Sequence, residues 1–401
     1  MFSLDRFYNI LHDNLISKLP NGKSSYFHPF GTYDQSLVLS NKFDILHTSS
    51  WSWKTDRPLF HCYFADQEPF YDYTLPILKK SLIWPDHIFS DCRINILANS
   101  EKSKFKTEFV KSAHYHDWYY FFHGFAALDW YRDFQYIEPQ SFDQFDKVFI
   151  CYNHLTSKLR SYRLHLVSNL IDQDVTKYGL VSLFSEGWRE TIRDPEIPLD
   201  NRARVKIHNA LKNVKQPLII DTSTPSGTLS ADIDFENAVS ALFHVVTETV
   251  YFDNKLHLTE KVFKPIVCRR PFFLVAAPGN LAYLKSYGFR TFDQWIDESY
   301  DEETDHYVRI EKITAEIARL CAMSPATLKQ IHKEMQEVLE YNFNHFYTTF
   351  KDRIVDELVD NFSDVLKQIN HGRIPGNHSR YHQRFELEPD YLDEVKKRLK
   401  Q

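Results

Sequence analysis

The stretch VVTETVYFDNKLHLTEKVFKPIVCRRP, residues Val245–Pro271, combines the two patterns from which the fold can be predicted. It begins inside a short apolar segment, Ala241–Thr247, which has the length and composition of a buried strand. A polar loop follows, and Thr259 then stands directly before a helix expected over Glu260–Cys268, in a position suited to capping it. A buried strand that leads through a loop into a helix is the repeating unit of a parallel α/β sheet.

The sequence on both sides of this stretch repeats the same alternation. We expect strands over Lys147–Tyr152, Leu180–Phe184, Pro217–Asp221 and Pro271–Ala276, and helices over residues 158–171, Asn201–Asn213 and Asn280–Tyr287. Gly288 is placed to end the last of these helices. Because ligands of open α/β sheets bind at the carboxyl ends of the strands, the loops that follow the strands are where a site is expected.

The remaining segments suggest how the chain is divided. The N-terminal part is aromatic and irregular, with strands expected at Phe60–Ala65 and Asn95–Ala98. Residues 305–370 have apolar side chains at helical spacing, and a polar connector and a short helix follow them. We therefore expect an N-terminal α/β domain over residues 1–145, a second α/β domain over residues 146–365 and a C-terminal helical tail over residues 366–401.

Composition excludes several classes of protein. The 401 residues are 43% hydrophobic and 25% charged, as in an ordinary globular protein, and only 10 are glycine, which leaves little room for glycine-rich phosphate loops. A net charge of −6 gives no general attraction to nucleic acid. The five cysteines are widely spaced without a C-x-x-C pair, so we expect reduced thiols and no zinc site. With no signal peptide and no long apolar run, we expect a cytoplasmic protein without a membrane anchor.

The first turn of the helix at Glu260 has side chains suited to a nucleotide. A helix N-terminus favours a diphosphate, and Lys261 adds a direct charge contact. The Glu260 carboxylate repels phosphate, but it can accept hydrogen bonds from the two hydroxyls of a ribose. Thr259 and Glu260 also fit ordinary helix capping, so the turn by itself leaves both interpretations open.

The arrangement resembles the donor-site signature of the family 10 fucosyltransferases, which reads approximately F-x-x-x-x-E-N-S, then T-E-K, then P-V. Thr247-Glu248-Thr249 falls where E-N-S would lie, and Thr259-Glu260-Lys261 matches T-E-K. The Asn-Ser pair is missing after Glu248, and Arg269-Arg270 replaces the Ala-Gly that is usual before the second strand. The resemblance implies a GT-B fold, with two Rossmann-like domains facing a cleft and C-terminal helices, and a nucleotide-sugar donor whose sugar is unspecified.

A second segment, Asn153–Leu170, resembles the loop and helix from which an arginine of that family grips the donor diphosphate. Arg160 or Arg163 would do this here, because a guanidinium matches phosphate in bidentate fashion and residues three apart share a helix face. Both could instead be surface residues. For Glu248 two roles are open, namely contact with the donor base or sugar, and capping of its own loop.

The resemblance places the catalytic base in the N-terminal domain. Asp66-Gln67-Glu68-Pro69 follows the expected strand Phe60–Ala65, where a carboxylate could remove the proton of an acceptor hydroxyl. Glu68 and Asp66 are the candidates, and His123 is a further one because histidine titrates near neutral pH. Each of the three also fits a structural role in a turn or in the core.

Competing motifs are incomplete. Gly22-Lys23-Ser24 resembles the end of a phosphate loop, but Ser17 stands where the leading glycine is required. Asp232-Ile233-Asp234 has the D-x-D form of metal-dependent glycosyltransferases, yet it lies in a polar loop without a convincing strand before it. We therefore expect no essential cofactor and no metal.

The sequence thus predicts a fucosyltransferase-like hexosyl- or pentosyltransferase that is inverting and metal-independent. It would move a sugar from a nucleotide sugar to a hydroxyl of a glycan, a protein or a modified base. One alternative is a glycosyltransferase that acts on modified DNA bases. Another is a non-catalytic module that binds carbohydrate or nucleotide.

Overall fold

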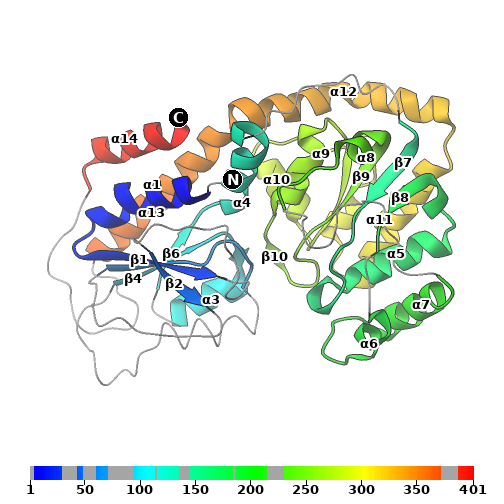
Figure 1. The fold of residues 1–401 in the computed structure, drawn as a ribbon, viewed down its shortest axis with the longest axis horizontal. Helices are drawn as coiled ribbons and strands as arrows, with labels where there is room; N and C mark the ends of the chain where they lie inside the picture. Colours follow the sequence, from blue (N-terminus) through cyan, green and yellow to red (C-terminus); the bar gives the residue numbers. More distant parts are fainter. Residues whose placement is uncertain are drawn as a thin grey trace. The chain divides into compact units, whose positions relative to one another are not determined.

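The computed structural model describes residues 4–28, 43–47, 60–70, 94–112, 115–134, 145–183, 187–214, 230–371 and 387–401. The chain divides into two compact units, which we call unit 1 (Met1–Trp130 with Lys351–Gln401) and unit 2 (Tyr131–Phe350). Each unit contains its own parallel sheet, and helices pack beside both sheets (Figure 1). The expected mixed α/β fold with parallel sheets is confirmed.

The sheet of unit 1 has the strand order β2-β1-β3-β4-β6, and all its pairings are parallel. Its strands are β1 (Gly22–His28), β2 (Phe43–His47), β3 (Phe60–Phe64), β4 (Ile94–Asn99) and β6 (His116–Tyr119), and the short strand β5 (Lys102–Ser103) lies outside this sheet. Its helices are α1 (Leu4–Asn14), η1 (Ile16–Lys18), α3 (Lys104–Ser112), α4 (Phe122–Leu128), α13 (Phe350–Asn370) and α14 (Pro389–Lys400). Helix α13 belongs to unit 1 from Lys351 onward, and the π-helical turn η2 (Asp129–Phe134) starts in unit 1 and ends in unit 2. The strands expected at Phe60–Ala65 and Asn95–Ala98 are confirmed as β3 and β4.

Gly22-Lys23-Ser24, the incomplete phosphate-loop motif, begins strand β1. A Cβ atom at Gly22 would lie 2.1 Å from the carbonyl oxygen of Ile16, so only glycine fits this close approach of two backbone segments. The glycine of the motif therefore has a packing function.

Aromatic side chains form much of the unit 1 core. Tyr8 of α1 is fully buried and packs against Tyr26, Phe64 and Phe122, with ring centroids 5.2, 5.6 and 6.0 Å away. Trp118 of β6 is equally buried, and its indole N–H donates a hydrogen bond of 3.0 Å to the carbonyl of Leu358 in α13. The high aromatic content of the sequence thus supplies large buried surfaces.

The C-terminal helices also belong to unit 1. Trp118 packs on Phe362 of α13 at 4.7 Å, and the Tyr391 hydroxyl of α14 donates to the carbonyl of Asn14 at 2.8 Å. These limits differ from the expected ones, which ended the second domain at residue 365 and set residues 366–401 apart as a tail. The reason is that α13 is one continuous helix whose buried face packs on the N-terminal sheet, so a boundary at 365 would divide it.

The sheet of unit 2 has the order β11-β9-β7-β8 and is again parallel throughout. Its strands are β7 (Lys147–Cys151), β8 (Gly179–Val181), β9 (Ala241–Thr247) and β11 (Phe272–Val275), and the short strand β10 (Lys255–Leu256) lies outside this sheet. Its α-helices are α5 (Tyr162–Asp172), α6 (Trp188–Arg193), α7 (Asn201–Leu211), α8 (Phe235–Ser240), α9 (Phe263–Val267), α10 (Asn280–Ser286), α11 (His306–Cys321) and α12 (Pro325–Thr348), and its 3₁₀ turns are η3 (Lys158–Arg160), η4 (Thr176–Tyr178), η5 (Glu260–Val262) and η6 (Ser299–Glu302). All seven residues of β9 are buried, as expected for a strand covered on both faces.

Most of the expected elements of unit 2 are present, with differences at their ends. The strand expected at Leu180–Phe184 is the shorter β8, and the helix expected over Glu260–Cys268 starts as the 3₁₀ turn η5 before becoming α9. Pro265 lies inside α9 and has no backbone N–H to give to the preceding turn, which favours a short helix. Gly288 has φ of 96° after α10, as its helix-ending position requires. The strand expected at Pro217–Asp221 lies outside the described residues.

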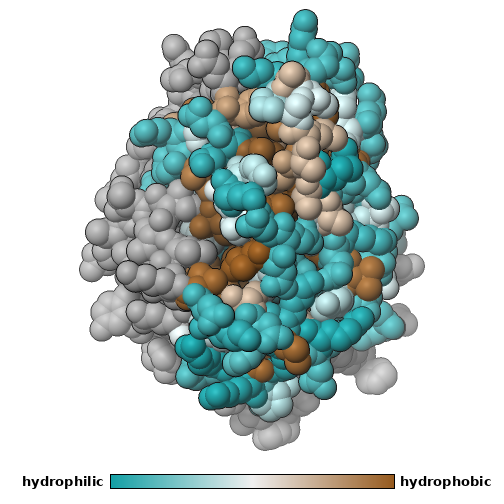
Figure 2. All heavy atoms as spheres, turned by 90° about the vertical axis from the view of Figure 1, so that its right-hand side faces the viewer, coloured by the Kyte–Doolittle hydropathy of each residue, from teal (hydrophilic) through white to brown (hydrophobic). Residues whose placement is uncertain are grey.

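Figure 2 shows one face of the molecule, on which hydrophilic side chains predominate and apolar side chains gather in a hollow near the middle. Within the described part of the chain, none of the helices combines the length and the apolar character needed to cross a lipid bilayer.

Candidate functional site

The strand order of unit 2 shows where its sheet is open to a ligand. After β7 the chain continues to β8 on one side of it, whereas β9 pairs with β7 on the other side. The loops that leave the carboxyl ends of β7 and β9, residues 152–161 and 248–259, therefore diverge at this point. In doubly wound sheets such a switch point is where ligands bind.

Glu248, the first residue after β9, fixes the second of these loops. Its side chain is fully buried; one carboxylate oxygen accepts a hydrogen bond of 3.1 Å from the Thr259 amide. The other oxygen accepts from the Thr259 hydroxyl at 2.6 Å and from the Thr249 amide at 3.2 Å. A buried carboxylate is costly without such donors, so these bonds hold Thr259 against the end of the strand. This arrangement corresponds to the loop-capping role of Glu248.

Thr259 does not cap the following helix in the expected way. It occupies the N-cap position of η5, but its hydroxyl makes no capping bond because it donates to Glu248 instead. Thr259 Oγ1 in turn accepts a hydrogen bond of 3.0 Å from the ammonium group of Lys261. The sequence-based expectation of simple side-chain capping was wrong, since it did not include the buried carboxylate.

The Lys261 ammonium group is held near the Thr249 hydroxyl at 3.4 Å and near the Glu260 carboxylate at 3.3 Å. The Lys261 side chain is 32% exposed, whereas that of Glu260 is 7% exposed. A cation is thus positioned by neighbouring oxygens and still reaches the solvent at the switch point.

The two arginines of the β7 loop and helix are placed differently. Arg163 is 4% exposed and donates to the carbonyls of Leu155 and Thr247, both at 2.9 Å. It also donates to the carbonyl of Glu248 at 3.3 Å, so it joins the loops after β7 and β9. Arg160, in η3, is only partly buried, which makes it the more accessible of the two arginines.

Two buried polar atoms of the β7 loop make no hydrogen bond within the described part of the chain. They are the side-chain oxygens of Asn153 and Ser161, and both residues are fully buried. The amide nitrogen of Asn153 donates to the Ser182 carbonyl at 3.1 Å, which fixes the orientation of that side chain. Buried polar atoms without a partner are uncommon in native proteins, and these two lie in a loop that leaves the sheet at the switch point.

The candidate residues of unit 1 lie at the end of β3, where the sheet order reverses between β1 and β3. Asp66 is 1% exposed, and its oxygens accept hydrogen bonds from the hydroxyls of Tyr8 at 2.9 Å and of Tyr120. Burial raises the pKa of Asp66 from an ordinary 3.8 to about 6, against the opposing effect of the two tyrosine hydrogen bonds. His123 is 7% exposed, and its Nε2 lies 3.0 Å from the carbonyl of Gln67.

The structure thus brings Asp66, Glu68 and His123 to the same end of one strand. Glu68 is only partly buried, so it is the more accessible of the two carboxylates. Sequence reasoning missed Tyr8 and Tyr120, because they are 58 and 54 residues away from Asp66 and no local pattern links them to it.

In the D-x-D motif Asp232-Ile233-Asp234, the second aspartate has a structural role. Asp234 caps α8, with its carboxylate accepting a hydrogen bond of 3.1 Å from the Asn237 amide. No group of three or more potential metal-ligating side chains occurs among the residues that the structure describes.

Comparison with known proteins gives no relative from which a function could be transferred: no family model, no curated protein and no solved structure matches the chain. The functional assignment therefore depends on the chemistry of the site itself.

Replacing Glu248 with Gln tests the role of the buried carboxylate. The glutamine amide would place N–H groups opposite the Thr249 and Thr259 donors, which need an acceptor. We therefore expect a loss of about 1–3 kcal/mol in the free energy of unfolding. Urea denaturation followed by circular dichroism measures this. Glu236→Gln, an exposed glutamate of α8, is the control, with an expected change below about 0.5 kcal/mol. Equal effects of the two substitutions would contradict the proposed role.

Replacing Asp66 with Asn tests the buried carboxyl of unit 1. Because the folded state favours protonated Asp66, its stabilising contribution is complete below about pH 4 and is lost as the pH rises through about 6. The asparagine variant lacks this dependence, so its free energy of unfolding should rise relative to wild type by up to about 3 kcal/mol between pH 4 and pH 7. Asp364→Asn, an exposed position of α13, should show no such trend. A constant difference between Asp66→Asn and wild type would show that Asp66 titrates normally.

Proposed function

We propose that the chain is a glycosyltransferase of the GT-B type that binds a nucleotide-sugar donor at the carboxyl ends of β7 and β9. The observation that carries the proposal is the position of Lys261, whose ammonium group is fixed by the Glu248–Thr259 interaction and remains partly exposed at the switch point. A preorganised cation stabilises the charge that develops on a departing diphosphate without further reorganisation.

The neighbouring residues support the same assignment. Arg160 adds a partly exposed guanidinium from the facing loop, and Asn153 and Ser161 are polar side chains in that loop. Glu260 would accept hydrogen bonds from ribose hydroxyls. In this proposal Arg163 acts indirectly, since its bonds to three backbone carbonyls hold the two loops in position.

The transfer itself would be a direct displacement with inversion. In such a displacement a base takes the proton of the acceptor hydroxyl while the hydroxyl oxygen bonds to the anomeric carbon and the bond from that carbon to the diphosphate breaks, and Glu68 is the first candidate for this base. Asp66 is less suited to this role, because both of its oxygens are bonded to tyrosine hydroxyls in the unit 1 core, and His123 remains a second candidate base. The acceptor would be a hydroxyl of a glycan, a protein or a modified base.

Release of nucleoside diphosphate from a panel of nucleotide sugars tests the proposal. We expect release from one donor, and Lys261→Ala should lower kcat/KM about 10- to 100-fold because a charge-assisted contact to the leaving group is lost. Lys177→Ala, at an exposed lysine of the same unit, should leave the rate unchanged. Release that does not depend on Lys261, or no binding of any donor, would contradict the assignment. Donor binding without release, with or without an acceptor, would instead identify a non-catalytic binding module.

Removal of divalent ions tests the role of the cationic side chains. If Lys261 and Arg160 neutralise the leaving diphosphate, activity should persist in excess chelator. The measurement is the release rate before and after addition of EDTA. Loss of activity in EDTA, with recovery on addition of manganese, would mean that a metal does this work and that the site has been assigned incorrectly.

A further inference from the structure

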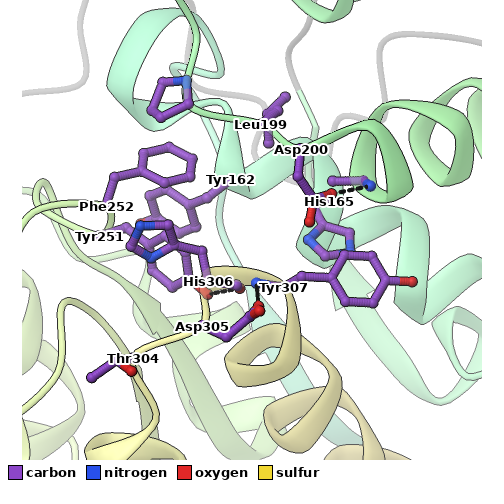
Figure 3. A pocket seen from close by; sticks show the side chains of 12 residues that line it. Tyr162, His165, Leu199, Asp200, Tyr251, Phe252, Thr304, Asp305, His306 and Tyr307 are labelled. Carbon is purple, nitrogen blue, oxygen red and sulfur yellow. Dashed lines mark hydrogen bonds between the residues drawn. The ribbon is translucent and has the colours of Figure 1, made fainter.

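Unit 2 contains a cavity of about 180 Å³ beside the switch point (Figure 3). It is formed by the start of α5, the loop after β9, the segment that enters α7 and the start of α11. Tyr162, Tyr251, Leu199 and Ala203 are buried at its base, whereas Pro198, Asp200, Thr304 and Asp305 are exposed at its rim. The interior is thus largely aromatic and the entrance is polar.

The aromatic side chains lie in two groups (Figure 3). In the first, Tyr162 and Tyr251 are stacked at 4.3 Å with an interplanar angle of 16°, and the Arg309 guanidinium lies 4.1 Å from the centre of the Tyr251 ring. In the second, His165 and Tyr307 are stacked at 4.7 Å with an angle of 28°. Because these stacks and the buried arginine fix the ring planes, the walls are preorganised for a flat ligand.

The polar groups around the cavity suit the edge of such a ligand. His165 is 2% exposed, and its Nε2 has no hydrogen-bond partner among the described residues. Burial, with Lys206 as the next cause, lowers the pKa of His165 to about 4, so the ring is neutral near pH 7. At the rim, Asp200 and Asp305 are both bonded to the Arg202 guanidinium, at 2.7 and 3.3 Å, which holds the starts of α7 and α11 together.

The size and position of the cavity restrict the ligand further. A cavity of about 150 Å³ accommodates benzene, so this one takes a single heteroaromatic ring system and is too small for a whole nucleotide sugar. The Tyr162 ring lines the cavity while its hydroxyl donates to the carbonyl of Glu248, the residue that fixes the Lys261 turn. The cavity and the cationic site are therefore linked through one side chain.

We propose that this cavity binds the base of the donor nucleotide, and that it selects a base with amino N–H donors over uracil. The inference rests on the proposed function. Asp200 and Asp305 are acceptors at the entrance, and a carboxylate that already accepts bonds still has lone pairs for an amino group. Uracil offers a single N–H between two carbonyl oxygens, and carbonyl oxygens that face these carboxylates are unfavourable, so uracil fits this entrance less well. His165 then contributes to base selection through its ring nitrogens.

Calorimetric titration of wild-type protein and variants with the diphosphates of adenosine, guanosine, cytidine and uridine, the four nucleosides and inorganic pyrophosphate tests the inference. His165→Phe keeps a ring against Tyr307 and removes the ring nitrogens. We expect it to weaken the binding of the preferred nucleoside diphosphate about tenfold. Ala203→Leu fills the cavity and should weaken the binding of this nucleoside diphosphate more than His165→Phe does. Neither change should affect the binding of pyrophosphate, whereas Lys261→Ala should weaken the binding of pyrophosphate and of the nucleoside diphosphate alike. Val205→Leu, at a 61% exposed position of α7, is the control.

The outcomes separate this inference from the proposed function. Diphosphate binding that depends on Lys261 but not on His165 or Ala203 would overturn the base cavity and leave the donor site standing. Nucleoside binding that depends on His165 and Ala203, with no effect of Lys261→Ala on any ligand, would support the cavity and contradict the donor site. A preference for uridine diphosphate, or no nucleoside or nucleoside diphosphate binding at all, would overturn the inference. Thermal unfolding of each variant shows whether Ala203→Leu folds, and His165→Phe tests the proposal by itself if it does not.

Discussion

The buried carboxylate of Glu248 is the interaction on which the arrangement of the candidate site depends. Its backbone amide continues the sheet by donating to the Val275 carbonyl at 3.0 Å, and its own carbonyl accepts bonds from Tyr162 and Arg163. Its side chain binds Thr259, 11 residues further along the chain. One residue therefore connects the ends of β9 and β11 with the loops after β7 and β9. Because a carboxylate at this depth is costly without hydrogen-bond donors, these loops are held together by one buried side chain.

The hydrogen bonds of the buried Glu248 carboxylate give a physical reason why charged and polar side chains lie beside an apolar sheet. Strands β9 and β11 are buried along their whole length and contain no Asp, Glu, Lys or Arg, whereas charged side chains occur in the loops at the carboxyl end of the sheet. Arg163 and Glu248 hold the backbone there, which leaves Lys261 and Arg160 partly exposed. The aromatic cavity shares Tyr162 with this network. A cationic site and a site for a flat ring are thus held by the same contacts.

Much of the fold could be predicted from the sequence, because a short apolar run such as residues 241–247 or 272–275 has few alternatives to a buried strand. The loops that form the candidate site could be predicted for the same reason. Its individual contacts could not. Arg160 and Arg163 look equivalent in the sequence. Only the folded backbone shows that the Arg163 guanidinium already donates hydrogen bonds to backbone carbonyls. The helical pattern of residues 350–370 likewise predicts α13 but not that its buried face packs on Trp118.

We propose a nucleoside diphosphate site at the carboxyl ends of β7 and β9. A crystal structure of the protein with a bound nucleoside diphosphate tests this most directly. We expect density for the diphosphate within hydrogen-bond distance of the Lys261 ammonium group and beside the loop that contains Arg160. Density for the ligand at any other position, or an empty site in crystals grown at a concentration that saturates binding in solution, would contradict it.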